Sequence, residues 1–341
     1  LAAVMLAPFS LAAQQPQRLS AFIDQTIALH PSIRAAERGL EKARALARAA
    51  GQYPYNPEIE LGYEESAEKT KEFGFSQTID VWGRTGAAEA QATAEIEVAA
   101  ATFSLIKTEL LESLLRGLGA NREQVSLLEL AEKRLNLSTR YLRLTRKFES
   151  AGDIGTADVL TAEVGKSNAE LQVAAATARV ATAQKELISL VGEQRAVWPE
   201  PTEIANIALV GFDPDIEKTP EMEITRATLQ ASKAGIVVAE KQWLPDPTFG
   251  VRIGKDGEEN LFGASLSFPI PVWNRGAAEQ AAASEDVASK GFLVAETRRR
   301  LHARLVTAEA NLRSTNEAVL NWKKNARPNI SRQEALLNRL A

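Results

Sequence analysis

Two stretches of this sequence, EFGFSQTIDVWGRTGAAEAQATA at 72–94 and LFGASLSFPIPVWNRGAAEQAAA at 261–283, follow the same plan. Each begins with alternating apolar and small or polar residues, passes through a Val-Trp-x-Arg turn, and enters an alanine-rich helix at Gly-Ala-Ala-Glu. An alternation with period two indicates a strand that has one apolar face. Each stretch therefore predicts a strand that leads directly into a helix.

These stretches belong to a longer internal duplication, because further pairs of similar residues recur at a spacing of 189 to 191 positions. A constant offset over several anchors is typical of a tandem repeat. We therefore interpret residues 19–192 and 219–341 as two copies of one unit, joined by a connector at 193–218. The anchors are His30-Pro31 with Thr219-Pro220, Asn56-Pro57 with Asp246-Pro247, Ser76 with Ser267, Trp82 with Trp273, and the two Gly-Ala-Ala-Glu segments.

Each repeat is predicted to contain a helix, a β-hairpin and a very long helix. In the first repeat a helix over 19–50 precedes a hairpin at 58–81 and a helical hairpin at 86–191. In the second repeat a helix precedes a hairpin at 248–268 and a long helix at 276–341. Period-two alternation predicts the individual strands, and the charged, polar turns at 67–71 and 255–260 are expected to face water. The predicted strands cover 58–64, 73–81, 248–254 and 262–268.

The stretch from Gly86 to Glu149 contains no proline and predicts one helix of about 95 Å. Two series of leucines recur along it every seven residues and lie on nearly opposite sides of the helix. Such a helix contacts a neighbour on each side, as in the wall of a hollow bundle, whereas a simple antiparallel coiled coil explains only one series. The series are Leu128, Leu135 and Leu142, and Leu130, Leu137 and Leu144.

The long helix is expected to break at SAGDIGT, residues 150–156, before another helix returns over about 157–191. Glycine permits the tight turn that such a reversal needs. The first repeat is therefore predicted to end in a long helical hairpin with a glycine-containing tip.

The four strands have an apolar face and a polar face, which suits a sector of a transmembrane β-barrel. We predict that Glu58, Glu60, Asp80 and Arg252 face a watery lumen. Unpaired strand edges do not persist in lipid, so the sector must close with copies of itself. Three copies would supply twelve strands, enough to enclose a channel. The alternative is a soluble, half-buried sheet.

The composition excludes several classes of function. The 341-residue chain has a net charge of −4, no cysteine and two histidines, so there is no basic field for nucleic acid and no thiol or metal-spaced cluster. We expect no enzymatic activity and no cofactor. Residues 1–13 form an apolar run that ends in Ser-Leu-Ala-Ala, which we interpret as the remnant of a secretory signal peptide.

Taken together, these residues resemble the TolC-like outer membrane factor family, and within it the heavy-metal efflux (CzcC/CusC-like) branch. The resemblance covers residues 19–341 and is carried by Ser76–Arg84, Ser267–Arg275 and the tip Phe-x3-Gly-Asp-Ile-x3-Asp-Val-Leu-x-Ala-Glu at 148–163. It implies a mainly α protein with an internally duplicated fold. Three protomers would form a barrel in the outer membrane of a Gram-negative bacterium and an α-helical tunnel through the periplasm, a passive duct for heavy-metal cations.

The resemblance also implies partners and site residues. The tunnel would dock on a periplasmic adaptor (a membrane fusion protein) that is joined to an RND pump in the inner membrane, while the barrel would contact outer-membrane lipid. Trp82, Arg84, Trp273 and Arg275 would mark the strand-to-helix transitions. The adaptor-docking tip would comprise Gly152, Asp153, Ile154, Gly155, Thr156, Asp158 and Leu160, with Asp153 and Ile154 the most exposed.

Two alternatives stay open at this point. An outer-membrane conduit for drugs or for type I protein secretion would have the same architecture. A periplasmic coiled-coil adaptor or scaffold belongs to another class, and would carry strands with a soluble core. The repeat also sets Ala341 opposite Ala151, so we expect the chain to be a fragment that stops before a second tip and lacks a returning helix of about 40 residues.

Overall fold

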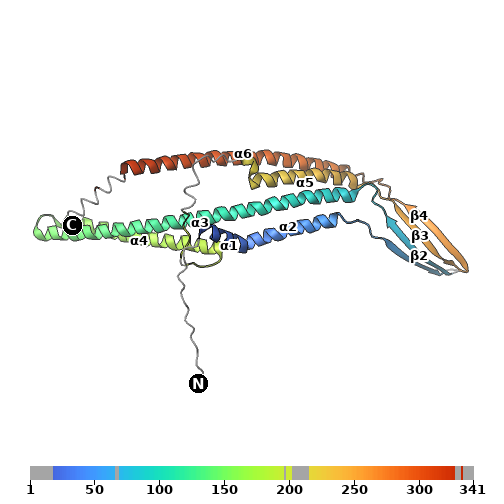
Figure 1. Cartoon of the computed structure of the whole chain (residues 1–341), viewed down its shortest axis with the longest axis horizontal. Helices are drawn as coiled ribbons and strands as arrows, with labels where there is room; N and C mark the ends of the chain where they lie inside the picture. The colour runs from blue at the N-terminus through green and yellow to red at the C-terminus, as the bar shows by residue number, and fades with distance from the viewer. Residues whose placement is uncertain (1–17, 66–68, 196, 202–214, 327–331, 333–341) are drawn as a thin grey trace, which may run out of the picture. The chain divides into compact units, whose positions relative to one another are not determined.

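The computed structural model describes residues 18–65, 69–195, 197–201, 215–326 and 332. These residues form long helices and one four-stranded antiparallel sheet (Figure 1), which confirms the fold class expected from the sequence. Among the described residues, no helix is both long and apolar enough to cross a membrane. The predicted signal remnant at 1–13, much of the connector at 193–218 and the last part of the helix predicted over 276–341 lie outside the described residues.

The chain divides into two compact units, and neither coincides with a predicted repeat. The first unit combines residues 1–31, 107–213 and 310–341, and the second combines residues 32–106 and 214–309. Helices α3 (Arg84–Ala151) and α6 (Ala277–Asn321) contribute residues to both units. Each unit therefore contains parts of both repeats, and the division into sequential repeats stays a prediction.

The first unit contains α1 (Leu19–Leu29), the later part of α3, and α4 (Thr156–Val191). Its core is formed by large side chains that are almost completely buried. The edge of the Phe22 ring meets Trp198 at a centroid distance of 6.3 Å, and the guanidinium of Arg195 lies 4.8 Å above the same ring. The buried core side chains include Phe22, Leu114, Leu118 and Leu187.

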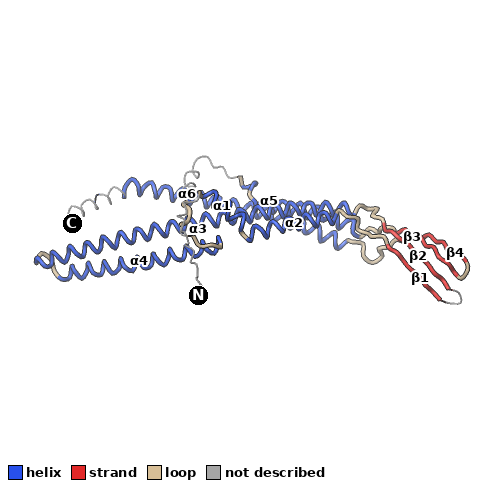
Figure 2. The backbone as a smooth tube through the Cα atoms, turned by 60° about the horizontal axis from the view of Figure 1, so that its bottom comes forward, coloured by secondary structure: helices blue, strands red, loops and turns tan. Residues whose placement is uncertain are grey.

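Small residues let α3 and α4 run close together as an antiparallel pair (Figure 2). A Cβ atom on Gly117 would lie only 2.8 Å from Leu187 Cδ2, so this leucine fills the space that glycine leaves. Alanines spaced seven residues apart line the buried face of α4, the spacing that keeps one helix face against a partner. They are Ala162, Ala169, Ala176 and Ala183.

The second unit contains α2 (Pro31–Ala50), the first part of α3, α5 (Pro220–Gln242) and most of α6. The single helix predicted over 19–50 is wrong in one respect, because His30 is extended and separates α1 from α2. Proline disfavours the helical conformation of the residue before it, so Pro31 ends α1 and begins α2. A short 3₁₀ helix, η2 (Ile216–Lys218), precedes α5, and a π-helix, η3 (Trp322–Ala326), follows α6.

The sheet is a meander of β1 (Glu58–Glu65), β2 (Lys69–Thr78), β3 (Thr248–Asp256) and β4 (Glu259–Ser267), in that order. Its two hairpins have equivalent registers. Glu58 lies opposite Ser76 in the first hairpin, and Thr248 lies opposite Ser267 in the second. Strands β2 and β3 join the hairpins, which leaves β1 and β4 as the two edges within the described chain (Figure 2).

Several predicted strand bounds were wrong. Strand β2 begins at Lys69, so Lys71 lies in the ladder and not in a turn, and the second turn is only residues 257–258. Charged side chains can point away from the sheet on either face, so they do not interrupt the backbone hydrogen bonds. At its other end β2 stops at Thr78 and not at residue 81, because the next residues bond to other segments, as described below.

Candidate functional site

One face of the sheet is apolar and uncovered within the described chain. Successive residues of a strand point to opposite faces, and the register aligns three rows of apolar side chains on this face. Leu61 and Phe262, in the same row, are each 78% exposed. Exposed rows of this size indicate a surface that contacts something apolar. The rows contain Leu61, Phe73, Ile253 and Phe262; Ile59, Phe75, Val251 and Ala264; and Phe249 and Leu266.

The apolar rows end in a polar row near the hairpin turns. In this row Tyr63, Lys71, Lys255 and Asn260 lie side by side on adjacent strands. Tyrosine and lysine at the end of an apolar band are typical of the border between lipid and water.

The opposite face of the sheet is polar and strongly acidic. Arg252 is the only cation on it among the described strand residues, and its Nη1 lies 3.6 Å from Glu72 Oε2. A hollow of about 190 Å³ on this face is lined by Glu60 and Arg252, by glycine and serine residues, and by parts of Phe75 and Val251. Glu58, Glu60 and Arg252 all lie on this face, as predicted, but its exposure to a lumen stays a prediction. Its carboxylates are Glu58, Glu60, Glu64, Glu72, Asp256 and Glu259.

Asp80 lies beyond the end of β2, and its carboxylate caps helix α3. Oδ1 accepts a hydrogen bond from the Arg84 backbone N–H at 2.8 Å, and Oδ2 accepts from the Thr85 N–H at 2.9 Å and from the Thr85 hydroxyl at 2.8 Å. Burial alone would raise the pKa of Asp80, but the hydrogen bonds from Thr85 and Arg84 outweigh it, so its pKa lies below the ordinary value. The strand predicted through this residue missed the cap.

The carboxylate of Asp246 connects segments from both repeats. Only 4% of this residue is exposed. Oδ2 accepts a hydrogen bond of 2.8 Å from the Tyr55 hydroxyl and lies 3.4 Å from Arg84 Nε, while Oδ1 accepts from the Val81 N–H at 3.3 Å. Sequence reasoning used Asp246 only as an anchor of the duplication and missed Tyr55. The one available signal was the change from Asn56-Pro57 in the first repeat to Asp246-Pro247 in the second.

The four predicted transition residues occupy two different environments. The Trp82 indole donates to Pro245 O at 2.8 Å, and Arg84 Nε donates to Lys241 O at 3.1 Å. In contrast, Trp273 is 97% exposed, Arg275 is exposed, and neither has a hydrogen bond or ion pair with the described part of the chain. The two Val-Trp-x-Arg segments are therefore alike in sequence but not in contacts.

The tip between α3 and α4 is a tight turn in which several backbone N–H groups have hydrogen-bond acceptors. Gly152 has φ of +83°, and the N–H groups of Gly152 and Asp153 donate to the last turn of α3 at 2.9 Å each. At the start of α4, the Gly155 N–H donates to Asp158 Oδ2 at 3.3 Å. Asp153 is exposed but Ile154 is half-buried, so the expected exposure of Ile154 was wrong. Nothing in this geometry tests the docking role of the tip, which stays a prediction.

The two leucine series of α3 differ in burial. Leu142 packs with Val159 and Ala162 of α4 in a buried cluster, whereas Leu130 is 62% exposed and Leu137 is 42% exposed. The hairpin thus buries Leu142 and leaves Leu130 and Leu137 exposed, while the other leucines of both series are half-buried. An uncovered apolar series on a long helix indicates a further neighbour.

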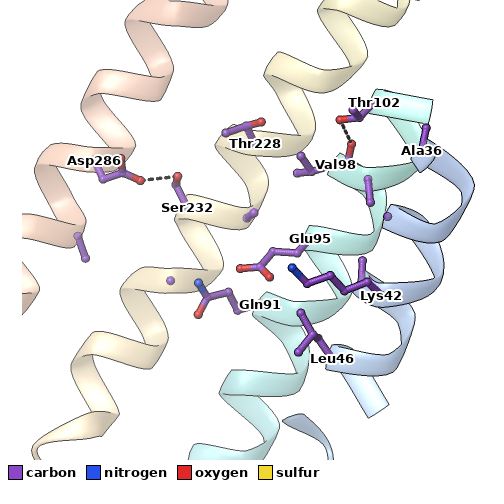
Figure 3. Close-up of a pocket in the computed structure, with 16 residues that line it drawn as sticks. Ala36, Lys42, Leu46, Gln91, Glu95, Val98, Thr102, Thr228, Ser232 and Asp286 are labelled. Atoms are coloured by element: carbon purple, nitrogen blue, oxygen red, sulfur yellow. Dashed lines mark hydrogen bonds between the residues drawn. The ribbon is translucent and has the colours of Figure 1, made fainter. Parts of the chain in front are cut away.

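A groove of about 750 Å³ lies among α2, α3, α5 and α6 of the second unit (Figure 3). Its floor consists largely of small side chains, and Lys42, Glu95 and Asp286 bring charges to it. Ser232 donates a hydrogen bond of 2.6 Å to Asp286 Oδ2 (Figure 3), and this bond lowers the pKa of Asp286. The described residues contain no group of three or more acidic, histidine or cysteine side chains placed to hold a metal ion.

The sequence model for the outer membrane efflux protein family matches residues 22–193, just over half of the chain. The chain belongs to the outer membrane efflux protein family. This family consists of channel proteins and not enzymes. The assignment therefore removes the alternative of a periplasmic adaptor or scaffold.

Known members of the outer membrane efflux protein family are similar to the chain over most of its length. The cobalt-zinc-cadmium resistance protein CzcC of Cupriavidus metallidurans is 23% identical over 282 residues, which covers 80% of this chain and 67% of the relative. The crystal structure of CusC superposes with a TM-score of 0.78 at 15% identity and covers 93% of this chain and 81% of CusC. The open MtrE outer membrane channel of Neisseria gonorrhoeae gives a TM-score of 0.72 at 16% identity, with coverages of 95% and 79%.

Proposed function

We propose that three copies of this chain close into a passive channel through the outer membrane, which exports heavy-metal cations as one component of a tripartite RND-type efflux system. The observation that carries this proposal is the sheet with one uncovered apolar face and one acidic face. Edge strands β1 and β4 lack partners within the described chain, and an unpaired backbone group in lipid costs several kcal/mol. Identical subunits that join β4 to β1 around a ring satisfy every edge.

The acidic face supports a preference for cations. Each chain carries there six carboxylates (Glu58, Glu60, Glu64, Glu72, Asp256 and Glu259) against the single guanidinium of Arg252. A pore lined by one sign of charge concentrates ions of the opposite sign. The name of the relative CzcC, a cobalt-zinc-cadmium resistance protein, points to metal cations as the cargo. Cargo in transit needs no resident metal site.

The helices support a tunnel that continues from the barrel. The exposed leucines Leu130 and Leu137 provide the contact with a neighbouring hairpin, while Leu142 holds the hairpin itself together. The tip around Gly152 and Asp153 is the end at which a periplasmic adaptor would bind, and the adaptor would connect the tunnel to the inner-membrane pump.

Single-channel recording in planar lipid bilayers tests this function. In a KCl gradient, the reversal potential should show a preference for K⁺ over Cl⁻. Replacing Glu58, Glu60 and Glu64 with glutamine should reduce that preference, whereas Arg252→Gln, on the same face, should increase it. Anion selectivity, or the absence of conductance, would contradict the proposal.

Growth measurements distinguish the cargo. Deletion of the gene should sensitise cells to Zn²⁺ or Co²⁺ and leave tolerance of neutral drugs unchanged. The opposite pattern would favour the drug-export conduit, and a loss of one secreted protein alone would favour type I secretion.

A further inference from the structure

Within the chain, the first strand-to-helix transition is held by the segment that precedes β3. The Trp82 indole donates to Pro245 O, Arg84 Nε donates to Lys241 O, and the Arg84 guanidinium approaches the Asp246 carboxylate. These contacts join the first repeat to the second. We call this set of contacts the joint. In the joint, the Trp-x-Arg segment after one hairpin is hydrogen-bonded to the segment before the next hairpin.

The second strand-to-helix transition does not make the equivalent contacts within the described chain. Trp273 is 97% exposed and Arg275 is exposed, and neither bonds to the described part of the chain. Tryptophan is highly buried on average, and tryptophan and arginine are both enriched among the side chains that carry most of the binding energy of protein interfaces. Trp273 and Arg275 are therefore residues of the kind that interfaces bury, and they are exposed in the single chain.

We propose that a second copy of the chain supplies the missing half, through its segment from Gly51 to Asn56. This inference rests on the proposed ring. Within the chain, the transition after the first hairpin contacts the segment before the second hairpin. In the ring, the transition after the second hairpin would make the same contacts with the segment before the first hairpin of the next copy. The residue numbers of the two sets of contacts differ by 190 or 191. The Trp273 indole then donates to the Tyr55 backbone oxygen, and Arg275 donates to the Gly51 backbone oxygen, both on the second copy.

The receiving segment is available for this contact. Gly51 and Asn56 are exposed, and within the described residues Tyr55 O accepts one side-chain hydrogen bond, from Gln77 Nε2 at 3.2 Å. A carbonyl oxygen can accept two hydrogen bonds, so it can also receive the Trp273 indole.

One difference separates the joint between copies from the joint within the chain. The position of the buried carboxylate Asp246 is taken in the first repeat by Asn56, a neutral amide. Arg84 therefore has a buried carboxylate as its partner, whereas Arg275 would meet a neutral amide at this position, with only the exposed carboxylate of Glu89 beside Gly51 in the described chain. Arg275 is charged and can still donate charge-assisted hydrogen bonds to backbone oxygens, but it has no counterpart of the Arg84–Asp246 ion pair with a buried carboxylate. Pairs with exposed carboxylates contribute little, so the joint between copies is the weaker of the two. This order suits subunits that fold first and assemble afterwards.

The sheet register gives a second, independent expectation for the same interface. Ser76 lies opposite Gly250 where β2 pairs with β3, and the same offsets place Ser267 of β4 opposite Glu60 of β1 in the second copy. Directly opposed residues of antiparallel strands have Cα atoms about 4.5–5.5 Å apart, which is within reach of a disulfide. The chain contains no cysteine, so an introduced pair reports on this contact alone.

The first test is disulfide cross-linking in outer-membrane fractions. A protein that carries both Ser267→Cys and Glu60→Cys should form reducible covalent oligomers that end at three subunits. The matched control carries Ser267→Cys and Glu58→Cys, which is two residues out of register, and should cross-link at least tenfold less. Equal cross-linking of both pairs, or none of either, would overturn the proposed register.

The second test measures the joint. Trp273→Ala and Arg275→Ala should each raise the trimer dissociation constant in detergent at least tenfold, with unchanged helix content by circular dichroism. The control is Trp322→Ala, at a tryptophan in η3 that is 51% exposed, and should leave the constant unchanged. A conducting trimer that Trp273→Ala and Arg275→Ala do not weaken overturns this inference and leaves the proposed function standing. A protein that stays monomeric in the membrane overturns both.

Discussion

The hydroxyl of Tyr55 donates a hydrogen bond of 2.8 Å to Oδ2 of Asp246, across 191 residues of sequence. That separation matches the repeat period, so the bond joins equivalent regions of the two repeats just before their hairpins. Arg84 approaches the same carboxylate to 3.4 Å. The two hairpins are thus tied together within one chain before any second copy is involved.

Replacement of Asp246 should destabilise the fold strongly. Asp246→Ala leaves the Tyr55 hydroxyl, the Val81 N–H and the Arg84 guanidinium without their shared acceptor, and loss of one member of a buried ion pair costs about 3 kcal/mol or more. Urea unfolding followed by circular dichroism measures the change in the free energy of unfolding. The control Asp24→Ala, at an exposed residue of α1, should stay within about 0.5 kcal/mol of the parent. Equal effects of the two substitutions would contradict the role given to Asp246.

The Asp80 cap should make stability depend on pH. The folded pKa of Asp80 lies below its ordinary value, so its contribution is present above pH about 4, the unfolded pKa, and is lost as the pH falls through the folded pKa. Asp80→Asn should cost about 1 kcal/mol at pH 7, because the amide cannot replace the charge-assisted hydrogen bonds that both carboxylate oxygens accept. The difference between Asp80→Asn and the parent should shrink by pH 2–3, as measured by thermal unfolding at each pH. A difference that does not change with pH would show that the carboxylate charge is irrelevant.

The same substitution at two glycines of the second unit should have opposite effects. Gly276 has φ of +70°, and a Cβ atom there would lie 2.6 Å from Trp243 Cδ1, so Gly276→Ala should destabilise the protein by at least about 1–2 kcal/mol. Gly291 lies inside α6, and no side chain or other segment of the described chain comes within 4 Å of an added Cβ. Gly291→Ala should therefore stabilise by about 0.5–1 kcal/mol. Melting temperatures that move in the same direction would refute this reading of the second transition.

Substitutions in the two leucine series should affect different properties, one the stability of the single chain and the other the assembly of the trimer. Leu142→Ala removes a buried side chain and should lower the free energy of unfolding by about 2–5 kcal/mol. Leu137→Asn, at a side chain that is 42% exposed, should leave the unfolding of the single chain nearly unchanged but weaken the trimer. Subunit mass in detergent and urea unfolding measure the two effects. If Leu137→Asn left the trimer intact, the outer series would not be an interface.

A substitution at the tip should leave the fold and the trimer unchanged but weaken docking of the adaptor. Asp153 is exposed, so Asp153→Arg should not change the helix content or the trimer. It reverses a charge at the proposed contact, and cross-linking to the periplasmic adaptor in cells should fall at least tenfold, about 1.4 kcal/mol. Glu309→Arg, an exposed charge reversal on α6, is the control. Cross-linking of the Asp153→Arg protein at the parental level would place the docking site elsewhere.

The regular elements could be predicted because their patterns are local. Period-two alternation located all four strands, and the absence of proline after Gly86 located α3, which runs from Arg84 to Ala151. The break at His30 was missed although Pro31 signals it. Element ends were less accurate, because the role of Asp80 depends on where a backbone stops pairing and not on its hydropathy.

The joint could not be predicted, because it depends on contacts between distant repeats. Tyr55 and Asp246 become neighbours only when β2 pairs with β3 in one register. Trp82 and Trp273 occupy the same sequence pattern, yet only Trp82 has a neighbouring repeat within the chain on the required side. Sequence similarity between the repeats therefore hid their different surroundings.

The central claim is that uncovered strand edges are closed by identical subunits. Native mass spectrometry of the protein extracted from outer-membrane fractions tests it most directly. We predict one species with three times the mass of the 37.0 kDa chain, less any processed segment, and no stable monomer. A monomer with its sheet intact, recovered from the membrane, would contradict the account.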